Sequence, residues 1–180
     1  MKLVKFIVAL LLTAGLTFLF DQSLSVGGTS IPPFGKFLNP FTGFWQNATP
    51  AQGKTAETID LDGLSAPAKV LYDERMVPHI FAANLRDAYF LQGYVTAKER
   101  LWQMDITIRS TVGRLAEVMG ERLLDRDRLQ RRKGFGFGAA NTLKAWSKDP
   151  EVLGLVEQYA AGINAYILSL KPSQYPVEFK

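Results

Sequence analysis

The sequence predicts an α+β fold that is mainly helical and carries a β-hairpin before its first long helix. Apolar residues recur at steps of three and four over residues 85–119 and 149–170, the period of one face of an α-helix. Residues 70–82 instead hold two short runs rich in β-branched, apolar and aromatic residues around a polar turn, which is typical of a hairpin.

Composition excludes several classes of protein. The 180 residues are 47% hydrophobic, which is enough for one packed domain and argues against global disorder. The net charge of +4 is too small by itself to indicate a nucleic-acid binder. Because the chain has no cysteine, a disulfide framework, a cysteine nucleophile and a thiolate metal site are excluded.

The N-terminus has the pattern of an export signal. Lys2 and Lys5 precede the uncharged, mostly apolar residues 6–20. A helix over that stretch covers about 22 Å, and including residues 1–4 brings it close to the ~30 Å of a hydrocarbon core. We therefore expect residues 1–25 to be a signal peptide or a membrane anchor. The protein is expected to be exported, and either periplasmic or anchored through residues 6–20.

Residues 26–56 have the composition of a linker rich in Gly, Pro and aromatic residues. A fully solvated linker would not retain so many large rings. We expect an extended path in which the aromatic side chains lie on the folded body or on a partner chain. The residues concerned are Phe34, Phe37, Phe41, Phe44 and Trp45.

Residues 57–180 are predicted to form the folded part. Leu61–Gly63 is a turn signal, and the two strands are expected on either side of the polar stretch Asp73–Arg75. Pro78 requires the second strand to begin at or after it.

A long helix is predicted from Leu85, with Asn84 as its N-cap and Asp87 in its first turn. Gly113 is expected to end or bend it, and a shorter piece to stop at Gly120. The apolar positions of this predicted face are Phe90, Tyr94, Ala97, Leu101, Met104, Ile108, Val112 and Leu115.

Two further helices complete the prediction. One covers residues 128–147 and is interrupted by a flexible loop at the Gly-Phe-Gly-Phe-Gly stretch, residues 134–138. The other begins at Asp149–Glu151, where a capping carboxylate, a proline and an acid come together, and is closed by Pro172. The tail from Tyr175 is expected to be extended.

The candidate catalytic residues all have a structural explanation that we favour. His79, the only histidine, lies in a strand-like run, so we expect it to bind a nearby carboxylate or backbone group. In the charged cluster Lys98–Arg100, Glu99 lies on a different helical face from Asp105. Asp105 is instead spaced to pair with Arg109.

Binding motifs are also weak. The basic stretch Arg122–Lys133 lacks aromatic interleaving, so we predict no nucleic-acid partner. Residues 134–138 lack the spacing of a phosphate-binding loop, and Trp102 is expected to be a core or interface anchor. We assign no catalytic, cofactor-binding or metal-binding residue, because the chain offers no credible pair of nucleophile and base.

Five segments in order resemble the penicillin acylase (penicillin amidase) family of N-terminal nucleophile hydrolases, in the N-terminal part of its α-chain region. They read VPHIFA at 77–82, Asp87-Ala88, GYVTAKERLWQMD at 93–105, GRLAEVMG at 113–120 and YAAGINAYI at 159–167. PVEF at 176–179 resembles the extended segment that follows. Two departures are Met76, where the family usually has Gly, so that this turn is expected to differ, and Glu99, where it usually has Asp.

The resemblance implies a part of an αββα architecture. Family members are exported precursors that cut themselves into an α chain and a β chain, whose first residue, usually Ser, is the nucleophile and whose own α-amine is the base. Substrates are N-acyl amides such as β-lactam side chains or acyl-homoserine lactones. Calcium is expected in the full-length member, with its ligands outside these 180 residues.

We therefore expect a truncated front end of an amide hydrolase, with the remainder of the precursor as partner. By itself it should be inactive and poorly soluble. The alternative is a stand-alone exported binding or structural protein, or an inactive fragment, that uses the same helical scaffold.

Overall fold

The chain was analysed as a computed structural model that describes residues 2–26, 29–31, 33–47 and 58–179. It divides into two compact units. The first contains residues 1–55 and 171–180, and the second contains residues 56–170.

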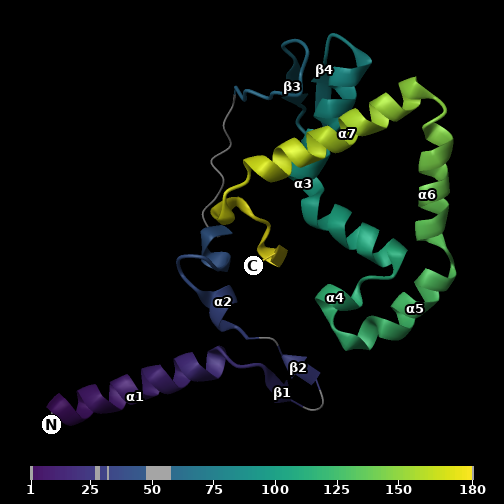
Figure 1. The fold of residues 1–180 in the computed structure, drawn as a ribbon. Helices are drawn as coiled ribbons and strands as arrows, with labels where there is room; N and C mark the ends of the chain where they lie inside the picture. Colours follow the sequence, from purple (N-terminus) through teal and green to yellow (C-terminus); the bar gives the residue numbers. More distant parts are fainter. Residues whose placement is uncertain (1, 27–28, 32, 48–57, 180) are drawn as a thin grey trace. The chain divides into compact units, whose positions relative to one another are not determined.

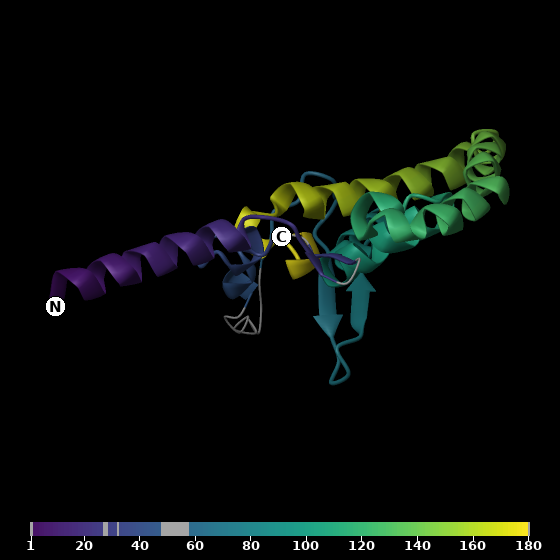
Figure 2. The same ribbon diagram turned by 90° about the horizontal axis from the view of Figure 1, so that it is seen from below.

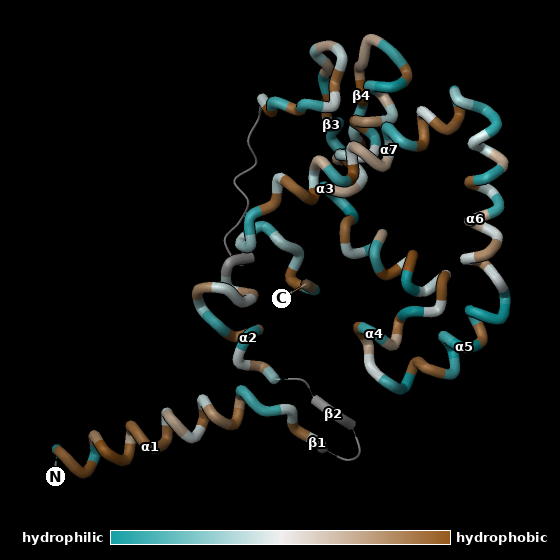
Figure 3. The backbone as a smooth tube through the Cα atoms, viewed as in Figure 1, coloured by the Kyte–Doolittle hydropathy of each residue, from teal (hydrophilic) through white to brown (hydrophobic). Residues whose placement is uncertain are grey.

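The first unit begins with a long apolar helix, α1 (Lys2–Phe20) (Figures 1 and 3). All of its side chains are exposed. A short antiparallel sheet follows, and the chain then returns to the end of α1, where Gly35 lies close to the Phe20 carbonyl and to Asp21. The other elements of this unit are β1 (Leu24–Val26), β2 (Thr29–Ile31), α2 (Gly35–Leu38), η1 (Phe44–Asn47), η3 (Pro172–Gln174) and η4 (Val177–Phe179).

The second unit consists of a β-hairpin followed by helices, which confirms the predicted α+β, mainly helical class. Its hairpin projects from the helical part (Figure 2). The elements are β3 (Lys69–Tyr72), β4 (Pro78–Phe81), α3 (Leu85–Val112), α4 (Ala116–Met119), η2 (Glu121–Leu123), α5 (Leu124–Arg132), α6 (Phe135–Trp146) and α7 (Pro150–Ser169).

The core of this unit is the contact between α3 and α7, which lie side by side (Figure 1). Glycines let the two backbones touch: a Cβ on Gly93 would overlap the Tyr159 carbonyl oxygen, and a Cβ on Gly162 would overlap the Phe90 carbonyl oxygen. The Tyr94 ring packs edge-on against an α7 tyrosine, with centroids 5.4 Å apart. The buried apolar residues are Phe90, Leu91, Tyr94, Val95, Ala97 and Leu115.

The predicted helix ends are confirmed. The Asn84 side chain accepts a hydrogen bond from the Asp87 amide at 2.9 Å, and Gly113 ends α3 in the left-handed region with φ of 73°. Asp149 caps α7 by accepting from two first-turn amides. One feature was not predicted: Arg100 is non-helical, with φ −138° and ψ 24°, so α3 is kinked there.

The kink divides the predicted apolar face of α3. Before it, Phe90, Tyr94 and Ala97 are buried. Beyond it the same face is covered unevenly, since Ile108 is exposed whereas Leu115 is buried.

Two sequence predictions are wrong and one is right only in part. The helix predicted over residues 128–147 is interrupted as expected, but only at Lys133–Gly134. Residues 135–138 are helical rather than a flexible loop, because only Gly134 adopts a left-handed conformation and the Gly138 amide bonds back to the Gly134 carbonyl. The tail over Val177–Phe179 is a 3₁₀ turn closed onto the Pro176 carbonyl, since proline suits a first turn. The aromatic residues from 34 to 45 include the helical turns α2 and η1, so their path is not extended.

Candidate functional site

His79, the only histidine of the chain, lies in the β3–β4 hairpin. In its register Leu71 pairs with His79, and Val70 pairs with Ile80 on the opposite face. His79 Nε2 lies 3.5 Å from Asp73 Oδ2, so the predicted carboxylate partner is present. His79 is exposed, and its partner Asp73 lies in the turn of the same hairpin, so the pair has the geometry of a turn contact.

Asp73 organises the hairpin turn. Its Oδ1 accepts hydrogen bonds from the Val77 and Arg75 amides, each at 2.9 Å. The bond from Val77, then that from Arg75 and the neighbouring His79, hold the pKa of Asp73 below its usual value. This loop is therefore fixed by one ionised carboxylate.

Met76 lies in the same turn with φ of 60°, the conformation that glycine favours. The residue that replaces the family's usual Gly is therefore itself left-handed, and a difference from the family's turn stays a prediction.

Replacing Met76 with Gly should stabilise the chain by about 0.5–1 kcal/mol, because the left-handed strain is relieved. Little burial is lost, since Met76 is 69% exposed. Thermal unfolding followed by circular dichroism measures the change, and Met76→Ala is the control that keeps the strain. Equal stability of the two variants would contradict this account of the turn.

Tyr72 connects the hairpin to the kink in α3. Burial and the adjacent Glu99 carboxylate raise the pKa of Tyr72 to about 12. Glu99 immediately precedes the non-helical Arg100. The sequence placed Glu99 in a charged cluster on the helix and did not predict this contact with Tyr72, which joins residues far apart in the chain.

Asp87 is the most enclosed acid of the second unit, at the start of α3. It accepts hydrogen bonds from the Ser65 amide at 3.0 Å, the Ser65 hydroxyl at 2.7 Å and the Asn84 side-chain amide at 2.9 Å. The two bonds from Ser65, followed by that from Asn84, lower the pKa of Asp87. The network attaches the loop before the hairpin to the helix.

Stability should fall in acid because these pKa values are lowered on folding. A carboxylate with a depressed folded pKa contributes stability above its unfolded pKa and loses it as the pH falls through the folded pKa. For Asp73 and Asp87 the window therefore lies below the usual value of 3.8. Thermal unfolding as a function of pH measures this loss, and Asp87→Asn should flatten the profile; an unchanged profile would contradict the role of the network.

The charged residues beyond the kink form ion pairs. Asp105 and Arg109 pair at 2.8 Å as predicted, and Arg109 also binds Glu117 at 2.9 Å. In the basic stretch, Arg131 donates to the Gly113 carbonyl at 2.8 Å and Arg126 to the Ser110 hydroxyl at 2.7 Å. Arg126 and Arg131 thus link α5 to the C-terminal end of α3.

A groove of about 420 Å³ lies between the hairpin and α3. It is lined by Pro78, Ile80, Ala88, Tyr89, Gln92, Val95 and Thr96. The hairpin and the second half of α3 also expose large apolar side chains, namely Leu71, Met76, Val77, Phe81 and Ile108. Such an arrangement is suited to contact with another protein surface.

Among residues 2–26, 29–31, 33–47 and 58–179, no three His, Asp or Glu side chains come together as a candidate metal site. The calcium expected for the full-length member stays a prediction.

A family model described as penicillin amidase matches residues 67–180, which include the hairpin, α3 and α7. The chain belongs to the penicillin amidase family. The matched region contains all five segments quoted above, together with PVEF at 176–179.

Curated relatives agree with the family. The chain is 37% identical over 127 residues to penicillin acylase 2 proenzyme of Pseudomonas sp. (strain SE83), covering 68% of this chain and 15% of that protein. It is 36% identical over 103 residues to penicillin G acylase of Escherichia coli, covering 57% and 12%. Acyl-homoserine lactone acylase QuiP of Pseudomonas fluorescens (strain Pf0-1) is 36% identical over 122 residues, covering 67% and 15%.

A solved structure agrees with the fold. Thermostable penicillin G acylase from Alcaligenes faecalis matches with a TM-score of 0.55 and 32% identity, over 63% of this chain and 60% of that chain. The chain spans only 12–15% of the length of these curated relatives. The family assignment therefore applies to a scaffold region.

Proposed function

We propose that this chain is the N-terminal scaffold segment of an exported amide hydrolase whose nucleophile is an N-terminal Ser on a separate β chain. The observation that carries the proposal is the family match over residues 67–180. A terminal Ser with its own α-amine as base needs no histidine or cysteine, which suits a chain with one exposed His and no Cys.

The exposed apolar surface supports a role as one half of an interface. The outer face of the hairpin and α3 beyond its kink carry large apolar residues that the described part of the chain does not cover. Obligate interfaces have this character. We propose that the β chain of the precursor covers them.

The proposed substrates are N-acyl amides. The relatives named above are penicillin acylases and acyl-homoserine lactone acylases, which supports acyl transfer from a linear amide to the Ser oxygen and then to water.

We propose export through α1. It is the one helix among the described residues that is long and apolar enough to cross a membrane, by length and composition. A signal sequence passes the same test, so α1 enters the membrane either transiently or as an anchor. Calcium, if the full-length enzyme uses it, is proposed to bind outside the described residues.

Amide hydrolysis tests the proposal. The enzyme isolated from its source should release the acyl group from a penicillin or an N-acyl-homoserine lactone, whereas the 180-residue chain alone should not. Turnover by the purified 180-residue chain would contradict the scaffold role, because the proposed Ser nucleophile lies on the separate β chain.

A further inference from the structure

The segment from Phe34 to Trp45, here called the aromatic segment, exposes its rings. Phe41 is 80% exposed and Trp45 is 53% exposed. Phe44 stacks between two neighbours, with centroids 5.0 Å from Phe37 and 4.3 Å from Trp45. The segment carries one charge, Lys36, and no acid.

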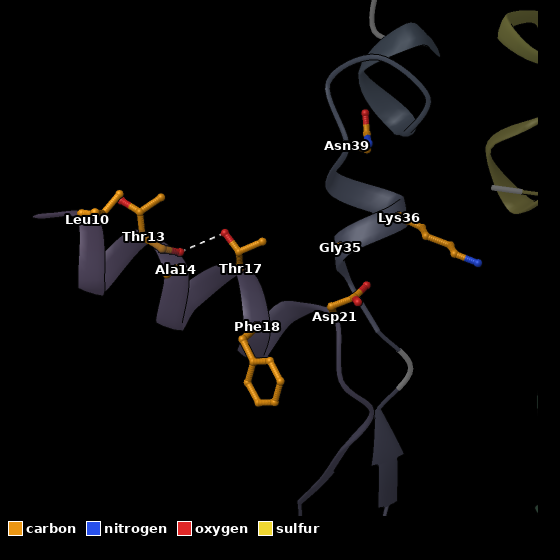
Figure 4. A pocket seen from close by; sticks show the side chains of 9 residues that line it. All are labelled: Leu10, Thr13, Ala14, Thr17, Phe18, Asp21, Gly35, Lys36 and Asn39. Atoms are coloured by element: carbon orange, nitrogen blue, oxygen red, sulfur yellow. Dashed lines mark hydrogen bonds between the residues drawn. The ribbon is translucent and has the colours of Figure 1, made fainter.

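The aromatic segment begins at the C-terminal end of α1. A Cβ on Gly35 would lie 3.4 Å from the Phe20 carbonyl oxygen and 3.5 Å from an Asp21 carboxylate oxygen. Figure 4 shows α2 leaving the end of α1 rather than running back along it. The 19 residues of α1 cover about 28 Å, close to the ~30 Å of a hydrocarbon core, so the segment starts where a spanning α1 would leave that core.

The turn of the aromatic segment satisfies several of its own backbone donors. Asn39 Oδ1 accepts from the Phe41 amide at 2.8 Å and from the Thr42 amide at 3.2 Å, and the Asn39 carbonyl accepts from Gly43 at 2.7 Å. The Leu38 amide bonds back to Phe34 at 2.8 Å. Because unsatisfied amides are costly where water is scarce, this turn is suited to a partly dehydrated environment.

We propose that the aromatic segment is a lipid-binding element that lies in the headgroup region of the membrane entered by α1. Aromatic rings and lysine favour this interface, with the rings at the boundary and the ammonium towards the headgroups. A lipid surface is favoured over a protein surface because the exposed rings are continuous with α1, an apolar helix with no buried residue. This inference rests on the proposed entry of α1 into the membrane.

The notch between α1 and α2 fits the same occupant. It has a volume of about 770 Å³ and opens at the end of the apolar helix. Its walls combine apolar side chains of α1, including Leu10 and Phe18, with the polar Asp21, Lys36 and Asn39 (Figure 4). A lipid likewise changes along its length from an apolar acyl chain to a polar headgroup, so its chemistry matches that of the notch.

Depth-resolved fluorescence quenching tests the proposal on the full chain with α1 intact. Trp102 and Trp146 are replaced by Phe, so that Trp45 is the only tryptophan, and the protein is reconstituted in phosphatidylethanolamine–phosphatidylglycerol vesicles containing brominated lipid. We expect a blue shift of the Trp45 emission and a loss of emission that is larger for bromine near the headgroup than for bromine deep in the acyl chain.

Two results would overturn the proposed lipid contact of the aromatic segment. The first is an unquenched Trp45 in membrane-bound protein, which would place the segment on protein or in water. The second is equal quenching in a matched protein that retains only Trp146, which would indicate non-specific adhesion. An alkaline carbonate wash distinguishes failure of this inference from failure of the proposed membrane entry of α1. Release of the chain by the wash refutes the anchoring of α1. A retained chain with unquenched Trp45 refutes only the lipid contact of the aromatic segment.

Discussion

Gly162→Ala should destabilise the second unit by about 3 kcal/mol, at the upper end of the overpacking range. The added methyl would overlap the Phe90 carbonyl oxygen. Backbone atoms of a helix cannot move aside as a side chain can, so α3 and α7 must separate. Urea unfolding of the chain in a mild non-ionic detergent, followed by far-ultraviolet circular dichroism, measures the loss.

Gly154→Ala is the matched control, since it is the same substitution in the same helix at a buried glycine. There the methyl would meet only the end of the flexible Arg86 side chain, and the gain in helix propensity of about 1 kcal/mol should make the change neutral or stabilising. Gly93→Ala should resemble Gly162→Ala, and the double variant should lose less than the sum because both separate the same helices. Equal effects at Gly154 and Gly162 would contradict the close approach.

Phe90→Ala should cost roughly 3–5 kcal/mol, the usual range for removing a buried ring. Phe90 is only 2% exposed, and its ring lies against Gly63 in the loop before the hairpin. Its loss leaves a cavity between that loop and α3. The free energy of unfolding from the same urea experiment measures the effect.

Phe81→Ala provides the comparison, because Phe81 is 57% exposed on the outer face of the hairpin. Its removal should change the stability of the chain by about 0.5 kcal/mol or less. If Phe81 instead proved as costly as Phe90, the core would not be where the structure places it.

Local chemistry was predictable from the sequence. Asn84 and Asp149 cap their helices because each offers a side-chain oxygen just before an apolar periodic run. Pro78 begins β4 because proline is confined to positions such as the first residue of a strand. Gly113 ends α3 because glycine readily adopts the left-handed conformation found there.

Features set by tertiary contact were not predictable. Gly93 and Gly162 have low intrinsic helix propensity, yet they are the places where the backbones meet. Their sequence context does not distinguish them from Gly154, which lies in the same helix as Gly162 but meets only a side chain. The kink at Arg100 has no comparable signal, because it falls within an unbroken helical period.

The functional assignment came from a different kind of information. Composition and spacing indicated an α-rich domain with a hairpin and no nucleophile–base pair, which is as far as the residues themselves lead. The activity is proposed from the family match, because in an N-terminal nucleophile hydrolase the reactive group lies on another part of the precursor.

The intact mass and N-terminal sequence of the protein isolated from its source test the central claim most directly. We expect a two-chain complex in which the segment described here belongs to one chain and the other begins with Ser, or with the related nucleophiles Thr or Cys. A single exported chain near 20 kDa, the mass of these 180 residues, with no second chain, would contradict it.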